Sequence, residues 1–252
     1  MVHRASYLIC ATPRSGTTLL CDLLTETGQA GAPHSYYRRQ DIPWRSEEWG
    51  VSRGETGDAT AFERDYLDAV LRVGAGATGV FGLRLMWGTL AELRERLAGL
   101  FAGELTTAAL LDRAFGPLTY VHVFREDRVS QAISLLKAEQ SGLWHLAADG
   151  TERQRTGPPA QIGYDGARLA ELVDELERDD AAWAAFFAES GISPLTVRYE
   201  NLAVDPERDV RRVLTALGQT SGPTAPVAPR TARMADHVSE EWRERFRREQ
   251  GR

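Results

Sequence analysis

The stretch from 12 to 18 (Thr-Pro-Arg-Ser-Gly-Thr-Thr) combines residue types that bind phosphate esters. It follows an apolar run at 7–11 that is typical of a buried parallel strand, and it precedes an apolar helix that begins near Thr17. In a strand–loop–helix unit, free backbone N–H groups and the positive end of the helix dipole converge on the loop. We therefore expect a phosphate-binding loop made of Pro13, Arg14, Ser15, Gly16, Thr17 and Thr18.

This loop differs from the nucleotide-binding pattern G-x-x-x-x-G-K-[ST]. Ala11 stands at the first glycine position and Thr17 at the lysine position, and Arg14 brings the positive charge inside the loop instead. A magnesium-dependent kinase or GTPase is therefore disfavoured, and the loop suits a phosphate ester held without metal. The alternative interpretation is an ordinary strand–helix turn that carries an arginine.

A second candidate anion site lies at Arg125, directly after a strongly strand-like run. A guanidinium group and a hydroxyl one helical turn further on, that of Ser130, suit a phosphate dianion. Ser134 is the rival hydroxyl, one more turn along. A surface salt bridge between Arg125 and an acidic neighbour at 126 or 127 is the alternative.

Strands and helices alternate along the chain, which predicts an α/β fold with a mostly parallel central sheet and helices on both faces. The predicted strands are 7–11, 80–86, 118–124 and 194–199. Beyond the first helix, the predicted helices are 62–73, 90–100, 106–115, 128–140, 164–190, 206–218 and 239–250. Ligands of such sheets bind beyond the carboxyl ends of the strands. Arg14 and Arg125 both follow strand ends, so we expect them to share one crevice.

Three segments connect or follow these elements. The region 31–57 is rich in Pro, Trp, Tyr and Arg and is expected to be a structured, substrate-facing loop with a short helix. The segment 147–163 is polar and is expected to be a loop that moves. Extended by two residues to 145–163, it is the second candidate loop, after 31–57, at the site of an acceptor substrate. The C-terminal segment 219–252 is expected to form an irregular, proline-rich loop followed by a terminal helix.

Composition limits the class of protein. The chain has 252 residues, which fits a single domain over 1–252, and its net charge of −6 argues against a nucleic-acid partner. The two cysteines, Cys10 and Cys21, are expected to be core thiols rather than a disulfide. No long apolar segment precedes the first strand, so we expect neither a signal peptide nor a membrane contact, and a cytoplasmic enzyme is the consistent interpretation.

The loop resembles the 5′-phosphosulfate loop of sulfotransferases that use 3′-phosphoadenosine 5′-phosphosulfate (PAPS), and more narrowly that of the bacterial trehalose 2-sulfotransferase family. The resemblance continues, in the family's order, through 31–37, 81–88, 124–134 and 239–242. It implies a P-loop-like domain, PAPS as the sulfuryl donor, no metal and a small-molecule acceptor. It also allows a homodimer.

The resemblance implies roles for the nucleotide-binding residues. Arg14 and the loop amides would contact the 5′-phosphosulfate, while Arg125 and Ser130 would hold the 3′-phosphate that distinguishes PAPS from adenylates. Arg233 lies in a basic C-terminal segment that, in other sulfotransferases, closes over the same phosphate. A solvated basic segment is the alternative for Arg233.

The acceptor side follows from the resemblance in the same way. Arg84 stands where the family usually has lysine, and either cation would stabilise sulfuryl oxygens or a substrate hydroxyl; a core-capping role is the alternative. Aromatic and polar side chains are expected to line the acceptor pocket, namely Tyr36, Trp87, Lys137, Gln140 and Trp144. Trp44 and Trp49 offer further flat apolar faces.

The important departure from the family is Ser35, because the trehalose enzymes carry a glutamate there that is the proposed general base. A hydroxyl is no base at neutral pH, and Ala32 replaces a second family glutamate. Three explanations stay open. His34 or another group takes the acceptor proton, since imidazole has a suitable pKa. The acceptor is a phenol or another acidic group. Or the protein has lost activity.

The sequence thus predicts in-line transfer of a sulfuryl group from PAPS to a hydroxyl of a sugar or a specialised metabolite. The residues predicted to take part in the chemistry are Arg14, His34, Ser35 and Arg84. One alternative is a protein that binds PAPS or adenosine 3′,5′-bisphosphate without catalysis, which Ser35 motivates. The other is an atypical P-loop kinase, which the missing lysine disfavours.

Overall fold

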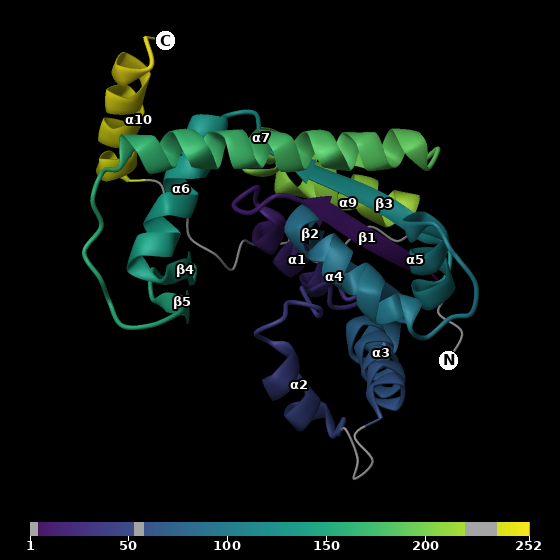
Figure 1. The fold of residues 1–252 in the computed structure, drawn as a ribbon. Coiled ribbons are helices and arrows are strands. Elements are labelled where there is room, and N and C mark those ends of the chain that lie inside the picture. The colour runs from purple at the N-terminus through teal and green to yellow at the C-terminus, as the bar shows by residue number, and fades with distance from the viewer. Residues whose placement is uncertain (1–4, 53–57, 220–235, 252) are drawn as a thin grey trace.

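A four-stranded parallel sheet forms the centre of the computed structural model, which describes residues 5–52, 58–219 and 236–251 (Figure 1). The strand order is β2-β1-β3-β6. These strands are β1 (Ala5–Ala11), β2 (Val80–Met86), β3 (Leu118–Phe124) and β6 (Leu195–Arg198). All three strand pairs are parallel, so the predicted α/β fold with a mostly parallel sheet is confirmed.

Each face of the sheet is covered by its own helices, because alternate residues of β1 point to opposite sides. Tyr7 and Ile9 pack with α1 (Thr17–Glu26) and the helices that follow β6. Leu8 and Cys10 pack on the other side. The first face holds α1, α8 (Tyr199–Leu202) and α9 (Pro206–Ala216); the second holds α3 (Ala59–Ala75), α4 (Trp87–Ala98), α5 (Thr107–Phe115) and part of α7 (Gly166–Glu189). Cys10 and Cys21 are buried free thiols, as predicted.

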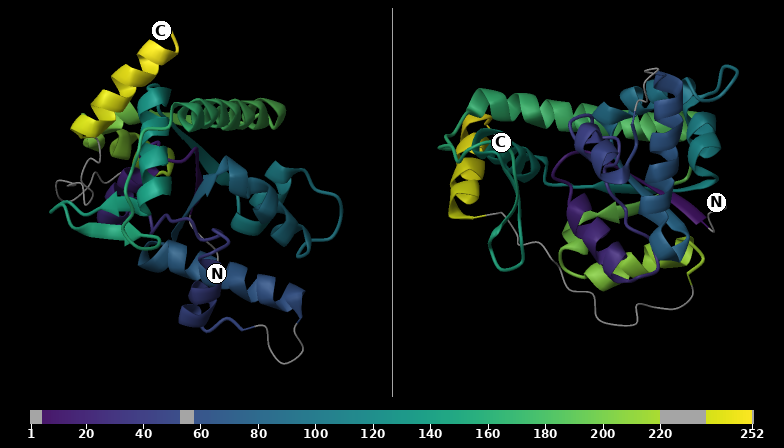
Figure 2. Two further views of the ribbon diagram at one scale, coloured as in Figure 1. Left: turned by 60° about the vertical axis from the view of Figure 1, so that its left-hand side comes forward. Right: turned by 90° about the horizontal axis from the view of Figure 1, so that it is seen from below.

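A third apolar cluster lies beyond the carboxyl edge of the sheet. There α6 (Arg128–Ser141) packs against the first half of α7 and against α10 (His237–Glu249), through residues such as Leu136, Leu172 and Trp242. The second half of α7 packs Trp183 and Phe187 into the sheet's core. This single long helix therefore holds the α6–α10 cluster against the sheet (Figures 1 and 2).

The segment predicted as a loop at 147–163 contains a strand instead. A short antiparallel hairpin joins β4 (Leu143–Leu146) to β5 (Glu152–Arg155), and Arg153 forms an ion pair with Asp22 of α1. The strands are only four residues long with irregular register, so sequence periodicity does not reveal them. In the 31–57 region, α2 (Ile42–Trp49) confirms the predicted short helix. A single 3₁₀ turn, η1 (Gly76–Thr78), precedes β2.

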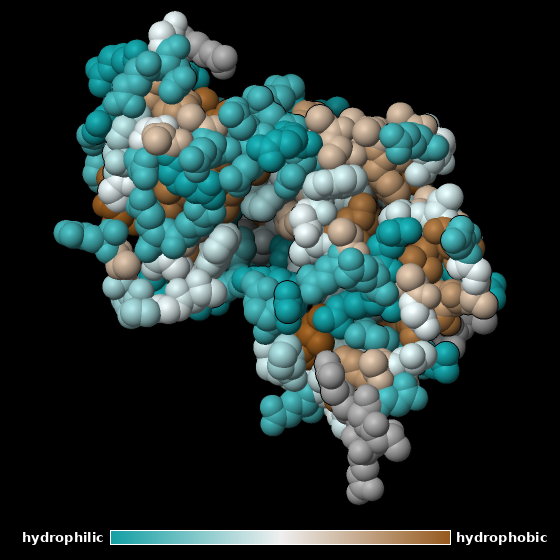
Figure 3. Space-filling view, viewed as in Figure 1, coloured by the Kyte–Doolittle hydropathy of each residue, from teal (hydrophilic) through white to brown (hydrophobic). Residues whose placement is uncertain are grey.

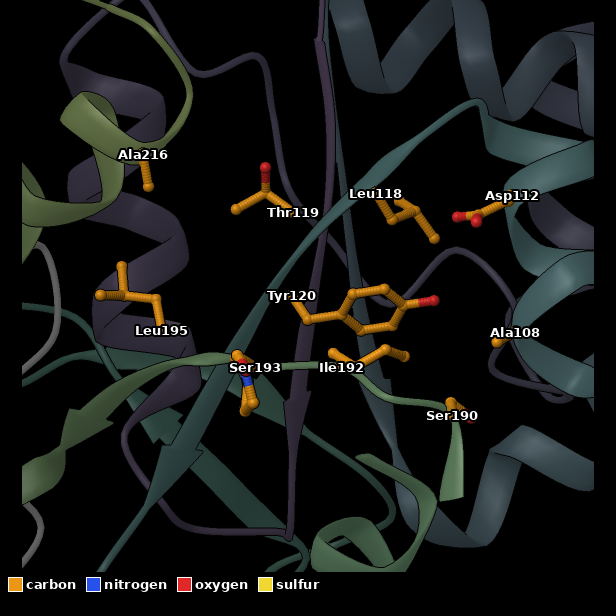
Figure 4. Close-up of a pocket in the computed structure, with 11 residues that line it drawn as sticks. Ala108, Asp112, Leu118, Thr119, Tyr120, Ser190, Ile192, Ser193, Leu195 and Ala216 are labelled. Carbon is orange, nitrogen blue, oxygen red and sulfur yellow. The ribbon is translucent and has the colours of Figure 1, made fainter. Parts of the chain in front are cut away.

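A cavity of about 660 Å³ opens at the amino ends of β3 and β6 (Figure 4). Tyr120, Asp112 and Ile192 are among its lining residues. The phosphate-binding loop follows the carboxyl end of β1, at the opposite edge of this parallel sheet. None of the predicted site residues lines this cavity. Among the described residues, no helix is long and apolar enough to cross a membrane.

Candidate active site at the carboxyl edge of the sheet

The phosphate-binding loop has a backbone that only certain residues tolerate. Gly16 ends the loop with φ +87°, and a Cβ at this position would lie 2.5 Å from Cδ2 of Tyr199. Arg14 has φ +64°, and among the described residues it alone combines a positive φ with a side chain. Such a conformation costs a non-glycine residue about 1–2 kcal/mol and persists only where contacts enforce it.

Those contacts come from three other residues. Gln131, fully buried on α6, donates from Nε2 to the Pro13 carbonyl at 2.7 Å and to Thr12 Oγ1 at 2.9 Å. Trp183 donates from Nε1 to the Ala11 carbonyl at 3.0 Å, and Ser15 Oγ donates to the Thr12 carbonyl at 2.8 Å. Gln131 and Trp183 are positioning residues; Gln131 lies in the 124–134 segment of the resemblance, whereas no motif marks Trp183, which sequence reasoning missed.

The N-terminus of α1 differs from those of five other helices of the described chain. Aspartate side chains cap α3, α6, α7, α9 and α10. The N-cap of α1 is Gly16, with no side-chain cap and no acidic residue in the first turn. The amide groups at this end and the positive end of the helix dipole are therefore not paired with a carboxylate of the cap or of the first turn, which suits an anionic ligand.

Arg14 lies between the loop, α6 and the hairpin. Its Nε donates to Ser134 Oγ at 3.0 Å and its Nη1 to the Trp144 carbonyl at 2.5 Å. Burial and the nearby charge of Arg125 lower the pKa of Arg14 to about 10. The two guanidinium groups thus lie near enough to repel each other. Their positions after the carboxyl ends of the neighbouring strands β1 and β3 predict this proximity. Ser134, the rival hydroxyl, is a partner of Arg14.

Arg125 lies over the ring of Tyr199, with 4.6 Å between the guanidinium carbon and the ring centroid. Tyr199 therefore lies close to both predicted phosphate sites, because the same ring lies against Gly16. The Ser130 hydroxyl has another partner: its Oγ donates to Asp127 Oδ2 at 2.7 Å, and the Asp127 side chain caps α6. Ser130 must give up this hydrogen bond before it can donate to a phosphate.

Arg84 joins the loop to Ser35. Its Nε donates to Ser35 Oγ at 2.9 Å and its Nη1 to Thr18 Oγ1 at 2.7 Å. On the other side, Thr18 Oγ1 lies 3.2 Å from Nε2 of His145 in β4. The structure thus assembles Ser35, Arg84 and Thr18 from three distant segments, and adds His145, which sequence reasoning missed because it carries no motif.

Both histidines of the site are neutral at pH 7. His34 has an exposed surface, yet its Nδ1 lies 2.9 Å from Nη2 of Arg45. Partial removal from water and the charges of Arg84 and Arg45 lower the pKa of His34 to about 3. For His145, burial and the charges of Arg14, Arg84, Arg153 and Arg38 lower the pKa to about 3. The crevice is cationic within a chain whose net charge is −6.

The predicted acceptor residues have other partners in the structure. Lys137 pairs with Asp236 at 2.7 Å, and the Gln140 amide bonds to the backbone of Gly163 at 2.9 Å. Trp87 packs edge-on against Trp183, with ring centroids 5.0 Å apart. These contacts fix α6 and α4 in place. The roles of Lys137, Gln140 and Trp87 in an acceptor pocket stay predictions.

Tyr36, Trp144 and Arg233 complete the predicted residues. Tyr36 is buried in the core with its hydroxyl on the Ala32 carbonyl. Trp144 is half-buried in β4, and its indole donates to Thr156 Oγ1 at 2.9 Å. Arg233 lies outside the described residues. Of the two described residues, the structure brings Trp144 into contact with the phosphate-binding loop, through the hydrogen bond from Arg14 to its backbone carbonyl.

The surface is notched in the view of Figure 3. The notch separates the part built from α6 and the hairpin, at left, from the part built from α2 and α3, at lower right. The carboxyl ends of β1 and β3 point toward it (Figure 1). Among the described residues, no group of three or more His, Cys, Asp or Glu side chains is arranged to hold a metal ion.

A parallel α/β domain with an arginine-bearing loop at an uncapped helix N-terminus is an arrangement in which phosphate-type anions commonly bind at the carboxyl edge of the sheet. Residues 6–249 match the family described as Stf0 sulphotransferase, and the chain belongs to that family.

Two relatives span nearly the whole chain. A trehalose 2-sulfotransferase of Mycobacterium tuberculosis (strain ATCC 35801 / TMC 107 / Erdman) is 32% identical over 262 aligned residues, covering 96% of this chain and 94% of the relative. One of Mycolicibacterium smegmatis (strain ATCC 700084 / mc(2)155) is 30% identical and covers 98% and 96%. Among solved structures, the sulfotransferase domain of the Synechococcus PCC 7002 olefin synthase aligns at 14% identity and a TM-score of 0.46, covering 96% of this chain and 86% of that domain.

Proposed function

We propose that this chain transfers the sulfuryl group of PAPS to a hydroxyl of a small acceptor, with a disaccharide of the trehalose type as the first acceptor to test. Family membership supports the reaction class, and the whole-length relatives support the acceptor class. One observation of this structure carries the donor: the Tyr199 ring lies both under Arg125 and against Gly16 at the uncapped N-terminus of α1, and the charge of Arg125 acts on Arg14 of the same loop.

The residues present fit PAPS. Bound PAPS supplies a sulfuryl group on a good leaving group, the 5′-phosphate of adenosine 3′,5′-bisphosphate. Loop amides and Arg14 would bind the 5′-phosphosulfate. Arg125, with Ser130 after it gives up its hydrogen bond to Asp127, would bind the 3′-phosphate, and Arg233 is proposed as its further partner.

The chain's own residues would stabilise the charge that moves during transfer. Arg14 and the amides from Gly16 to Thr18 would act on the leaving oxygen as it gains charge, where preorganised donors contribute strongly. Arg84, anchored on Thr18 and Ser35, would bind the equatorial sulfuryl oxygens. Ser35 cannot act as a base. Its hydroxyl would instead orient the acceptor through a hydrogen bond.

A calorimetric titration tests this proposal. Adenosine 3′,5′-bisphosphate, AMP and ATP are compared with and without magnesium. We expect the bisphosphate to bind more tightly than AMP without metal, and turnover with PAPS to yield a sulfated acceptor. Equal affinity for AMP and the bisphosphate would remove the 3′-phosphate site. Magnesium-dependent ATP binding would indicate a kinase, and tight bisphosphate binding without turnover on any sugar or phenol would indicate a binding protein.

A further inference from the structure

The proposed reaction releases one proton, and no residue considered so far is an obvious base for it. An alcohol that attacks sulfur must lose its hydroxyl proton, and Ser35 is the residue at the family's position for the base. Its Oγ accepts a hydrogen bond from Arg84 Nε at 2.9 Å, and a serine hydroxyl has no basic lone pair at neutral pH. Another group must therefore receive the proton.

His34 is next to Ser35 in the chain, yet its hydrogen bonding opposes this role. An arginine only donates, so the 2.9 Å contact with Arg45 Nη2 makes Nδ1 the accepting nitrogen of the imidazole. A neutral imidazole has one accepting nitrogen, and Nε2 must then carry the proton. His34 has no lone pair left for a substrate unless it gives up Arg45.

The accepting nitrogen of His145 has a neutral partner instead of a charged one. Its Nε2 lies 3.2 Å from Thr18 Oγ1, and Thr18 Oγ1 already accepts from Arg84. The Thr18 hydroxyl still has its own proton to donate, and in the tautomer with the proton on Nδ1 the imidazole accepts that proton at Nε2. The accepting nitrogen of His145 is thus held by a neutral hydroxyl, which can turn its proton elsewhere, whereas that of His34 is held by a charged guanidinium.

Neighbouring contacts hold this imidazole over the loop. The carbonyl of Trp144, the preceding residue, accepts from Arg14, and Arg153 of the paired strand binds Asp22 of α1. Four cations act on the imidazole, Arg14, Arg84, Arg153 and Arg38, and Asp22 balances Arg153. An anionic donor bound between these arginines offsets their charge and makes the imidazole more basic. Donor binding would thus prepare the base.

We propose that His145 Nε2 takes the hydroxyl proton of the acceptor during sulfuryl transfer. This inference rests on the proposed function. The acceptor oxygen forms a bond to sulfur as its proton moves to Nε2. The bond between sulfur and the bridging oxygen of the 5′-phosphate breaks, and its electron pair stays on adenosine 3′,5′-bisphosphate. The resulting imidazolium then releases its proton to solvent.

The first test uses the full chain with PAPS and trehalose. In His145→Gln we expect turnover to fall about 10²- to 10⁴-fold, the usual contribution of general-base catalysis, with unchanged affinity for adenosine 3′,5′-bisphosphate. The ascending limb of the wild-type pH–rate profile should disappear, and added imidazole should partly rescue His145→Ala. Loss of bisphosphate affinity, or a retained limb, would overturn the proposal. So would loss of the limb in His34→Gln alone.

The second test needs no acceptor. Imidazole nitrogens are followed by NMR against pH, with the His145 signals assigned by their absence from His145→Gln. We expect His145 to stay neutral down to pH 4.5 in the free protein and to titrate near the ordinary histidine pKa, about 6.5, with bisphosphate bound. No titration in the complex would overturn the inference. His237→Gln, an exposed histidine on α10, is the matched control. Failure of the wild type to bind bisphosphate would instead refute the proposed function.

Discussion

Arg14 of the phosphate-binding loop donates from Nη1 to the carbonyl oxygen of Trp144, 130 positions later, at 2.5 Å. This bond fixes the hairpin of β4 and β5 above the loop, and Arg153 on β5 is tied to α1 by its ion pair with Asp22. The same guanidinium therefore serves both the hairpin and the proposed anion. This position of the hairpin places His145 of β4 next to Thr18.

Replacing Arg14 by alanine should lower kcat far more than it weakens nucleotide binding, because this cation is proposed to act on charge that develops during transfer. Losing one such donor costs about 3 kcal/mol, or about a hundredfold in rate. Steady-state kinetics with PAPS and calorimetry with the bisphosphate measure the two effects. Arg113→Ala, at an exposed position of α5, is the control. Equal losses of kcat and affinity would count against this role.

Gly16→Ala should destabilise the loop more than Gly28→Ala does. Both glycines have a positive φ, +87° and +63°, so an alanine pays a backbone cost of about 1–2 kcal/mol at either position. At Gly16 the new Cβ also collides with the Tyr199 ring at 2.5 Å, whereas at Gly28 nothing lies within 4 Å. Thermal unfolding and bisphosphate titration of both variants measure the difference. Similar losses at both positions would show that the Tyr199 contact is unimportant.

Arg125→Ala should remove most of the preference for the bisphosphate over AMP. A hydrogen bond to a charged group contributes about 1.5–3 kcal/mol, so we expect the bisphosphate to bind about 10- to 150-fold more weakly and AMP to change little. Competitive titration of the two nucleotides gives both values. An unchanged ratio of affinities would place the 3′-phosphate elsewhere. Tyr199→Leu, which removes the ring under Arg125, should weaken bisphosphate binding less than Arg125→Ala does.

Acid should destabilise the free protein through its two site histidines. The folded pKa of His145 and of His34 is about 3, below the ordinary value near 6.5. Between these values the unfolded chain binds protons that the folded chain does not, so the free energy of unfolding falls as pH falls. One proton changes it by at most about 1.4 kcal/mol per pH unit, and the partial exposure of both rings reduces this.

The melting temperature of wild type, His145→Gln and His237→Gln is therefore to be recorded from pH 7 to pH 4. The slope should be shallower in His145→Gln only. Parallel curves for all three proteins would show that His145 binds its proton equally well in the folded and the unfolded chain.

The sequence by itself determined the sheet, the loop and the order of the elements. The bounds of β2 and β3 agree residue for residue with prediction, because buried parallel strands are continuous apolar runs bounded by turn residues. Arg14 and Arg125 each follow the end of a predicted strand. Because ligands of such sheets bind at the carboxyl ends of the strands, the sequence predicts that both arginines belong to the site. Local patterns suffice for these features.

Only the tertiary structure decided what surrounds the loop. Gln131 reaches Pro13 from α6, Trp183 reaches Ala11 from α7, and His145 reaches Thr18 from a four-residue strand, across separations of 118, 172 and 127 positions. No periodicity links residues so far apart, and β4 is too short and irregular to be read as a strand. These contacts exist because packing places α6, α7 and the hairpin around one edge of the sheet, which is a property of the whole chain rather than of any segment.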